Sequence, residues 1–291
     1  MRVGIAGLGK MGSALAENLI ARGYEVAVWD RSSERAQPLA VLGARPAPSP
    51  EALVEGMDAV LVMLWDDAAA TEISLGRIIP AASPPTIVIE MSTLSPAMYQ
   101  TLGEAASRKG LDFLACPVLG SVNLAASGAL TILASGSEAA FLRARVLLDS
   151  LGSSVTYVGL AGASAFLKLA NNAIIGIVAE SLRELLKLCA RAGIDEGLAV
   201  DSLTGAFGRI AASKVQQLHA HDTQPRFSLG ALHKDLLLAR NAAAAVGVAL
   251  PLLDAVLPAV EDGIAEGLGA RDYVSLVFSG AAGTASAAPG E

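Results

Sequence analysis

The sequence predicts an α/β chain in two parts, an N-terminal domain built on a doubly wound parallel sheet and an all-α C-terminal domain. Up to residue 161, short apolar runs typical of buried strands alternate with helical patterns, and from residue 162 onward only helical patterns follow. A length of 291 residues is enough for two such cores. We therefore expect domains over residues 1–161 and 162–279. Residues 280–291, rich in Gly, Ala, Ser and Pro, are expected to form a disordered tail.

Composition and charge exclude several classes of protein. Hydrophobic residues make up 53% of the chain, which is too many for a disordered protein, and the net charge of -7 with no cluster of Lys and Arg argues against nucleic-acid binding. Cys116 and Cys189 lie far apart and have no metal-ligand spacing. There is no signal-peptide pattern and no apolar run of membrane-spanning length. We expect a cytoplasmic protein without a metal ion, a membrane span or a nucleic-acid partner.

The N-terminal elements predict a dinucleotide site. An apolar run over residues 2–6 leads into the sequence GLGKMG at residues 7–12, a helical pattern follows, and a second apolar run covers residues 25–29. A GxGxxG sequence alone is weak, but strand, glycines, helix and strand in this order are typical of the Rossmann fold. The remaining alternative is a plain strand-to-helix turn.

The three glycines have distinct expected roles. Gly7 allows a tight turn, Gly9 lets the pyrophosphate approach the backbone, and Gly12 lets the helix pack closely on the sheet. The N-terminus of the following helix favours an anion, so Leu8 and Met11 are also expected beside the cofactor.

The end of the second strand bears on the choice between NAD and NADP. Asp30 is placed to accept hydrogen bonds from the ribose of NAD, whereas Arg31, Ser32 and Arg35 are plausible partners for the 2′-phosphate of NADP. Arg31 can also stack on adenine. The pattern slightly favours NADP, although Arg35 could equally be a solvated helix residue.

Later strand ends supply further candidates. Strands are expected over residues 58–64, 86–91, 111–118, 130–134 and 155–158, with helices over 96–109 and 138–148. Because ligands bind at the carboxyl edge of such a sheet, Leu64, Ser92 and Thr93 are candidates to contact the nicotinamide end. The alternative for this region is helix capping, which Ser95 before Pro96 fits well.

A further strand end carries Gly120 and Ser121. They could offer backbone N–H groups and a hydroxyl to an anionic substrate, and a simple turn is an equal alternative. Cys116 lies in an apolar strand with no His nearby in sequence, which favours an inert buried thiol.

The C-terminal part begins with a long helix that carries Lys168 and Asn172. These residues are four positions apart, so the amine and the amide project from one helix face. By itself Lys168 could be a surface lysine. The expected helices cover residues 163–192, 195–206, 209–220, 229–246 and 252–267.

Five motifs in order give the chain a family resemblance. With GLGKMG, STLSP, ACPVLGS, KLANN and the later Lys234-Asp235-Leu236, it resembles the β-hydroxyacid dehydrogenases over nearly its whole length. The resemblance implies a Rossmann domain, an all-helical domain joined through a long interdomain helix, and a dimer or tetramer formed through the helical domain.

The resemblance also implies residue roles. Lys168 matches the catalytic lysine and Asn172 the amide that helps to hold substrate. Ser92 and Thr93 match residues at the nicotinamide end. Lys234 and Asp235 match a pair beside the cleft.

One departure concerns substrate binding. Leu119 stands where the family commonly has Ser, whose hydroxyl holds the substrate carboxylate together with the amides of the next two residues, here Gly120 and Ser121. This departure leaves open whether the substrate carries a carboxylate, and a larger or more apolar carbonyl compound is the alternative.

The sequence thus predicts an NAD(P)-dependent oxidoreductase that interconverts a hydroxy acid or related alcohol and its aldehyde or ketone, with Lys168 as general acid and base. The closest alternative is an imine reductase on the same scaffold. An alternative of another class is a non-catalytic nucleotide-binding protein.

Overall fold

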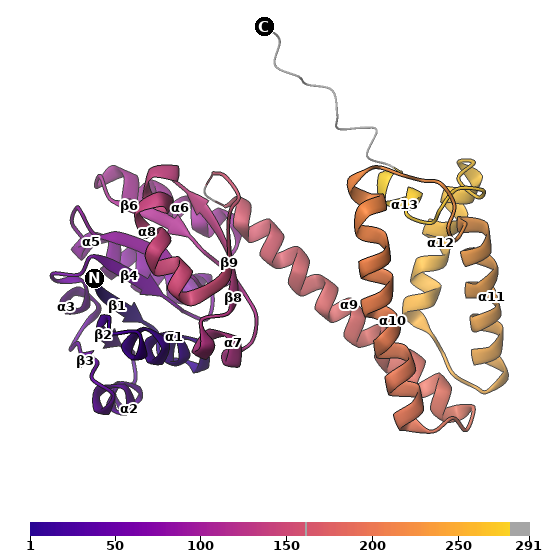
Figure 1. Cartoon of the computed structure of the whole chain (residues 1–291), viewed down its shortest axis with the longest axis horizontal. Coiled ribbons are helices and arrows are strands. Elements are labelled where there is room, and N and C mark those ends of the chain that lie inside the picture. Colours follow the sequence, from indigo (N-terminus) through magenta and orange to yellow (C-terminus); the bar gives the residue numbers. More distant parts are fainter. Residues whose placement is uncertain (161, 280–291) are drawn as a thin grey trace, which may run out of the picture. The chain divides into compact units, whose positions relative to one another are not determined.

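The structure of the chain is a computed structural model that describes residues 1–160 and 162–279, without the side chains of residues 207 and 209–213 (Figure 1). It consists of two compact units, which divide between Ala173 and Ile174. The expected boundary lies earlier, at residue 162, because the first turns of the long helix belong to the first unit. The expected tail, residues 280–291, lies outside the described residues.

The first unit is built on a nine-stranded sheet with the order β3-β2-β1-β4-β5-β6-β8-β7, and β9 pairs with β8. All pairs from β3 to β6 are parallel, whereas β8 is antiparallel to both β6 and β7. The order reverses beside β1, which is where open α/β sheets bind ligands. The strands are β1 (Arg2–Ala6), β2 (Glu25–Trp29), β3 (Arg45–Pro46), β4 (Ala59–Val62), β5 (Ile87–Glu90), β6 (Asp112–Ala115), β7 (Val118–Leu119), β8 (Leu130–Gly136) and β9 (Gly152–Tyr157).

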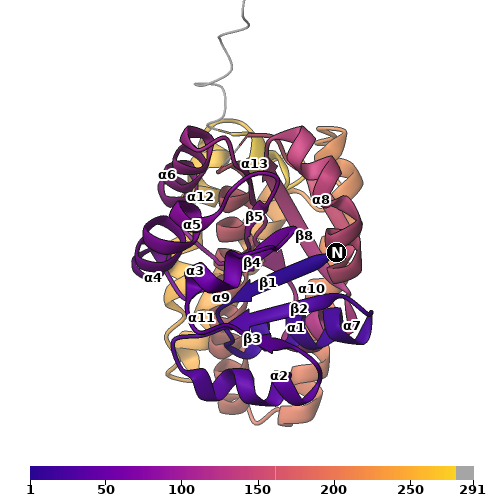
Figure 2. The same cartoon turned by 90° about the vertical axis from the view of Figure 1, so that its left-hand side faces the viewer.

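Helices cover both faces of this sheet (Figure 2). One face packs on α1 (Lys10–Ala21), α2 (Gln37–Val41), α7 (Val122–Ser127) and α8 (Glu138–Leu151). The other face packs on α3 (Pro50–Val54), α4 (Asp67–Ala70), the π-helix η2 (Thr71–Ile78), α5 (Ile79–Ala81) and α6 (Pro96–Arg108), and a 3₁₀ turn, η1, covers Ser33–Ala36. The buried strands fill both interfaces, which is why they read as continuous apolar runs.

The second unit is helical. The helix α9 (Ala163–Arg191) begins in the first unit and continues into the second, followed by α10 (Glu196–His219), α11 (Leu229–Ala245), α12 (Pro251–Ala265) and α13 (Ser275–Phe278). Helices α11 and α12 pack against each other. Among the helices that the structure describes, none is both long enough and apolar enough to cross a membrane.

The predicted fold class is confirmed, with two corrections to single elements. The run over residues 111–118 is two strands, β6 and β7, because Pro117 between them has no N–H for a ladder hydrogen bond. The two helices expected over 195–220 are one helix, α10, which continues through Gly208. A single glycine costs a helix only about 1 kcal/mol relative to alanine, so tertiary packing overrides it.

Candidate active site

A cavity of about 310 Å³ opens at the carboxyl edge of the parallel strands in the first unit. The loops that follow β4 and β5 form part of its wall, together with β7, the start of α1 and the second turn of α9. Its lining residues are Met11, Met63, Leu64, Trp65, Met91, Thr93, Val118, Gly120 and Lys168. Five of the sequence-predicted site residues therefore meet here: Met11, Leu64, Thr93, Gly120 and Lys168. The lining by Met63, Met91 and Val118 was not foreseen, whereas Trp65 belongs to the same strand end as the predicted Leu64.

Lys168 is the one charged side chain among the described lining residues. It is half-buried, and desolvation lowers the pKa of its amine below the ordinary value for lysine. Among the described residues of the first unit, 1–160 and 162–173, none forms a hydrogen bond or an ion pair with Lys168. A partly desolvated amine without a carboxylate partner exchanges its proton more readily than an ordinary surface lysine.

Ser164 anchors the first turn of the helix that carries Lys168. It is fully buried, its hydroxyl lies 2.7 Å from Ser135 Oγ, and it donates to the carbonyl oxygen of Ala115 at 3.2 Å. Because Ser164 stands four residues before Lys168, these bonds to β6 and β8 fix the helix face on which the amine projects. Asn172 lies one turn after Lys168, is exposed, and is not among the residues that line the cavity.

Ser92 is buried beneath the cavity rather than exposed in it. Its Oγ accepts a hydrogen bond from the backbone N–H of Leu64 at 2.7 Å and donates to Glu90. The next residue, Thr93, is exposed and lines the cavity. Ser95 caps α6 by accepting from the backbone N–H of Met98 at 3.1 Å, as the sequence predicts.

The strand end at β7 places neighbouring residues differently. Val118 and Gly120 line the cavity, whereas the half-buried Leu119 between them does not. Val118 and Leu119 are successive residues of β7, so their side chains point to opposite faces, which accounts for the difference between these two. Gly120 has a φ of +134°, and a Cβ there would lie 2.9 Å from Leu130 Cδ2, so glycine is required. Ser121 is exposed and precedes α7 without forming a side-chain cap.

The glycine-rich turn fits a diphosphate. Gly7 has a φ of +95°, and a Cβ at Gly12 would lie 1.9 Å from the carbonyl oxygen of Gly7, so their predicted structural roles are confirmed. A Cβ at Gly9 would meet nothing within 4 Å. The N-terminus of α1 has no side-chain cap and no acidic residue in its first turn. Its backbone N–H groups are therefore available to an anion that approaches over Gly9.

Asp30 ties this turn to the end of β2. One carboxylate oxygen accepts from the backbone N–H of Leu8 at 2.7 Å, and the other accepts from the N–H of Ser32 at 2.9 Å. Arg35 lies 3.6 Å from the first of these oxygens. Each oxygen retains a lone pair, so Asp30 can still accept a hydrogen bond from a ribose hydroxyl.

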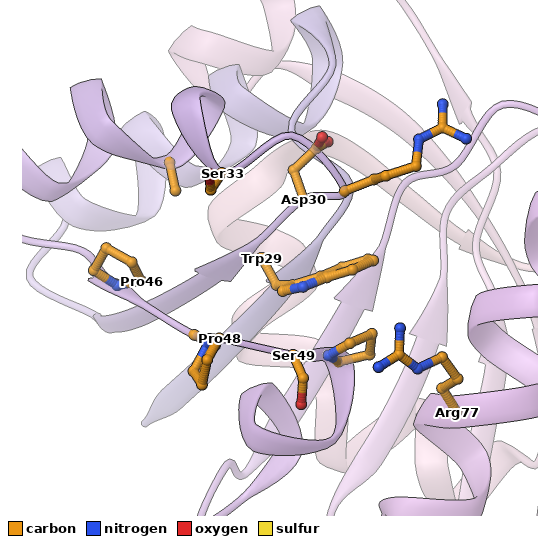
Figure 3. Close-up of a pocket in the computed structure, with 11 residues that line it drawn as sticks. Trp29, Asp30, Ser33, Pro46, Pro48, Ser49 and Arg77 are labelled. Atoms are coloured by element: carbon orange, nitrogen blue, oxygen red, sulfur yellow. The ribbon is translucent and has the colours of Figure 1, made fainter.

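A second cavity, of about 350 Å³, lies beside Asp30 at the end of β2 (Figure 3). Arg31 and Arg77 both line this cavity. The Trp29 ring lies between Asp30 and the segment that carries Pro48 and Ser49 (Figure 3). Arg77 is held by Glu51 through two hydrogen bonds of 2.7 and 2.9 Å, whereas Arg31 has no such partner in the described part of the chain. Arg77 was not foreseen, because the π-helix η2 has no recognisable sequence pattern.

The remaining predicted site residues belong to the second unit. Lys234 and Asp235 lie on α11, are exposed, and pair with each other at 3.0 Å. No cluster of three or more potential metal-binding side chains occurs among the described residues.

Family models match both units. A model described as the NAD binding domain of 6-phosphogluconate dehydrogenase matches residues 2–159. A second model, described as NAD-binding of NADP-dependent 3-hydroxyisobutyrate dehydrogenase, matches residues 162–278. The two matches meet within three residues of the boundary expected from the sequence, and together they cover nearly all of the described chain.

Named relatives align over nearly the whole chain. The uncharacterized oxidoreductase YfjR of Bacillus subtilis (strain 168) is 31% identical over 284 residues, which are 95% of this chain and 99% of that protein. The chloroplastic glyoxylate/succinic semialdehyde reductase 2 of Arabidopsis thaliana is 30% identical over 279 residues, which are 94% of this chain and 78% of that protein.

Solved structures share the fold. An imine reductase from Myxococcus stipitatus in complex with NADP+ superimposes with a TM-score of 0.86 at 20% identity, covering 96% of this chain and 99% of that one. The 3-hydroxyisobutyrate dehydrogenase of Mycobacterium tuberculosis with L-serine superimposes with a TM-score of 0.66 at 26% identity, covering 95% and 98%.

Three observations point to a nicotinamide dinucleotide: the uncapped glycine-rich turn, the cavity at the strand edge and the family models that together match nearly the whole chain. A diphosphate fits the turn, and both family models describe nicotinamide-dinucleotide domains. The chain belongs to the β-hydroxyacid dehydrogenase family and is an NAD(P)-dependent oxidoreductase.

Proposed function

We propose that this enzyme interconverts a hydroxy acid or related alcohol and its aldehyde or ketone, with Lys168 transferring the proton. The observation that carries the proposal is the position of Lys168, the one charged side chain in the described lining of a cavity at the carboxyl edge of the sheet. A bound nicotinamide ring supplies or accepts the hydride. The rest of the chemistry requires a group that manages charge on the substrate oxygen.

Lys168 suits that role in both directions. During reduction negative charge develops on the carbonyl oxygen, and a protonated amine beside it stabilises this charge and delivers a proton. During oxidation the neutral amine accepts the hydroxyl proton, and desolvation, which lowers the pKa of Lys168, increases the neutral fraction at a given pH. Asn172, one helical turn away, can hydrogen-bond the same oxygen without adding charge.

For the cofactor we favour NADP. Arg31 lines the second cavity without a partner in the described residues, and Ser32 and Arg35 follow it closely. A 2′-phosphate brings two negative charges, which a free guanidinium recognises better than a hydroxyl does. Asp30, already bonded to two backbone N–H groups, serves chiefly to hold the glycine-rich turn. In this proposal Gly7, Leu8, Gly9 and Gly12 hold the diphosphate, and Leu64 and Thr93 lie at the nicotinamide end.

The substrate half of the site supports a second candidate, an imine reductase. The described cavity lining is mostly apolar, with Met11, Met63, Leu64, Trp65, Met91 and Val118 beside the single charged side chain of Lys168. A larger apolar carbonyl or imine suits such a wall. If the substrate carries a carboxylate, the backbone N–H groups of Gly120 and Ser121 are the proposed partners in the first unit.

Further parts of the proposal concern the second unit and the assembly. Lys234 and Asp235 are proposed beside cofactor and substrate, respectively. Exposed apolar side chains on its helices, among them Leu198, Leu238 and Val256, support a homodimer or homotetramer formed through this unit. Light scattering during gel filtration measures the mass of this assembly, and a strictly monomeric protein would contradict it.

We also propose a cytoplasmic location, which is consistent with the free cysteines.

The decisive experiment is a steady-state screen of NADH and NADPH against acidic aldehydes, neutral aldehydes and cyclic imines. Turnover of aldehydes, with NADPH preferred, is the expected result. Turnover of cyclic imines without turnover of any aldehyde would replace the main proposal by the second candidate. Cofactor binding without turnover of any compound would contradict both.

A further inference from the structure

A buried carboxylate lies next to the cavity around Lys168, and the proposed reaction does not use it. Glu90 is the last residue of β5 and is fully buried. One carboxylate oxygen accepts a hydrogen bond from Ser74 Oγ of η2 at 2.6 Å, and the other accepts from Ser92 Oγ. No Lys or Arg pairs with Glu90 within the described residues. A buried acid that is partnered by hydroxyl groups instead of a cation is costly to keep ionised.

Ser92, the residue that Glu90 holds, is bonded at each of its polar atoms. Its Oγ accepts from the backbone N–H of Leu64 at 2.7 Å, its N–H donates to Glu90 Oε1 at 3.3 Å, and its carbonyl oxygen accepts from the Tyr99 hydroxyl. A serine hydroxyl that accepts from Leu64 must donate its own hydrogen elsewhere. Glu90 provides that acceptor, so the direction of the whole chain of hydrogen bonds depends on it.

The two loops joined in this way form part of the cavity wall. Leu64 follows β4 and Thr93 follows β5, and both line the cavity together with Lys168. Backbone that carries lining side chains must be held to within a fraction of an ångström for productive geometry. We propose that Glu90 is a positioning residue for this cavity, which through Ser92 fixes the backbone of the loops that carry Leu64 and Thr93.

The positioning depends on the charge of Glu90. Desolvation raises the pKa of Glu90 to about 7, although the hydrogen bonds from Ser74 and Ser92 partly offset this effect. The carboxylate accepts from both serines. The protonated acid must donate one O–H, so one of the two serines must turn to accept it. The network between the loops therefore differs between the two sides of neutral pH.

The ionisable groups nearest to Glu90 are Tyr99 and Cys116. Burial raises the pKa of Tyr99 on α6 and of Cys116 after β6 well above their ordinary values, so both stay protonated. Asp67 on α4 forms no hydrogen bond with Glu90 among the described residues, and its Oδ1 accepts from the backbone N–H of Ser95 at 2.9 Å. Lys168 lies in the cavity, and Val62 and Ala115, the partners of Glu90 on the neighbouring strands, carry no charge. Because Lys168 lines the same cavity and desolvation lowers its pKa, the Glu90→Gln variant decides whether a transition near neutrality in this region reports Glu90.

Trp65 offers a readout that needs no turnover. It follows Leu64, lines the cavity, and is 90% exposed. The chain has two tryptophans, so the indole N–H signals in a ¹H–¹⁵N spectrum are assigned with Trp29→Phe. In the unaltered protein we expect the Trp65 signal to titrate with a midpoint of about 7, following Glu90. Glu90→Gln should abolish this transition, and Ser74→Ala should raise its midpoint, because it removes a hydrogen bond that stabilises the ionised form.

Ser92→Ala and Ser74→Ala form a matched pair, since each removes one hydroxyl partner of Glu90 but only the former releases Leu64. Ser92→Ala should move the Trp65 signal and lower kcat by about tenfold, as expected for a buried donor left unpaired, while the NADPH dissociation constant changes less than about threefold. Ser74→Ala should lower kcat by less than about threefold.

Two outcomes would overturn the inference: an unchanged Trp65 titration in Glu90→Gln, or a Trp65 signal at its original position in Ser92→Ala. If Glu90→Gln does not fold, an unshifted midpoint in Ser74→Ala has the same force. The inference rests on the proposed function for the assignment of what the loops hold. A protein inactive on the whole substrate panel, yet with a Glu90-dependent titration, would contradict the function and leave the positioning role standing.

Discussion

Two lysines on long helices differ in the partners of their amines, and this difference separates a structural role from a catalytic one. Lys214 on α10 is buried, and its amine lies 2.9 Å from both oxygens of Asp272 and from Gln217 Oε1, and 4.6 Å from the centre of the Tyr273 ring. Lys168 on α9 is half-buried and has no such partner among the residues of the first unit that the structure describes. A fully partnered ammonium group holds a fold together, whereas a desolvated amine without a partner is available to a substrate.

Asp272 shows the structural side of this contrast. Desolvation would raise its pKa, but hydrogen bonds from Lys214 and from the backbone N–H groups of Phe227, Arg226 and Val274 hold it well below the ordinary value. Glu90, which has no cation beside it, shows the opposite direction. The pKa values of two buried carboxyls are thus shifted in opposite directions, because Asp272 accepts from an ammonium group and three backbone N–H groups, whereas Glu90 accepts only from Ser74 and Ser92.

The largest expected effect comes from removing the partnered lysine. Lys214→Met leaves Asp272 buried without its cation, which costs about 3–5 kcal/mol of unfolding free energy in comparable pairs. Urea denaturation followed by circular dichroism measures the loss, and Lys187→Met, at an exposed position on α9, is the control. A loss below about 1 kcal/mol would show that the Lys214–Asp272 pair contributes little to stability, which would contradict the structural role given to Lys214.

The same variant should change how stability depends on pH. A carboxyl whose folded pKa lies below its unfolded value, about 3.9 for Asp, contributes stability above that value and loses it as the pH falls through the folded pKa. Lys214→Met should raise the pKa of Asp272, so this contribution shrinks and its loss begins at a higher pH. Parallel acid-unfolding curves for the variant and the original protein would contradict this expectation.

Removing the unpartnered lysine should leave stability intact and remove activity. Lys168→Ala is expected to lower kcat by roughly a hundredfold or more, which is typical for loss of a general acid, with the NADPH dissociation constant nearly unchanged. In the original enzyme, the reduction rate should fall as rising pH deprotonates Lys168, while the oxidation rate should rise. Steady-state kinetics in both directions test this, and near-normal turnover in Lys168→Ala would remove the residue from the mechanism.

The sequence predicted local features of the fold and site well and long-range ones poorly. The glycine turn and the helix with Lys168 depend on residues adjacent in sequence, so their patterns sufficed. The roles of Glu90 and Ser92 depend on Ser74, which lies on a π-helix without a sequence signature. The clue available was a carboxylate at the end of an otherwise apolar strand. The proposed contact of Leu119 with substrate stays a prediction, and the sequence did not show that Val118, and not Leu119, lines the cavity, because the break at Pro117 determines which side chains face it.

The smallest expected effect concerns two arginines that repeat the contrast between the lysines. Arg77 is bound to Glu51 through two hydrogen bonds, whereas Arg31 lines the same cavity without a partner in the described residues. Arg31→Ala should therefore weaken NADPH about tenfold more than NADH, since one charge-assisted hydrogen bond to the 2′-phosphate contributes about 1.5–3 kcal/mol.

Arg77→Ala is the matched control for this prediction. It removes a guanidinium that Glu51 already neutralises, so the ratio of the two cofactor dissociation constants should change less than about threefold. Fluorescence titration of NADH and NADPH with both variants gives the ratio. Equal losses for the two cofactors in Arg31→Ala would mean that Arg31 only stacks on adenine, and a larger change of the ratio in Arg77→Ala would show that a paired cation can still select the cofactor.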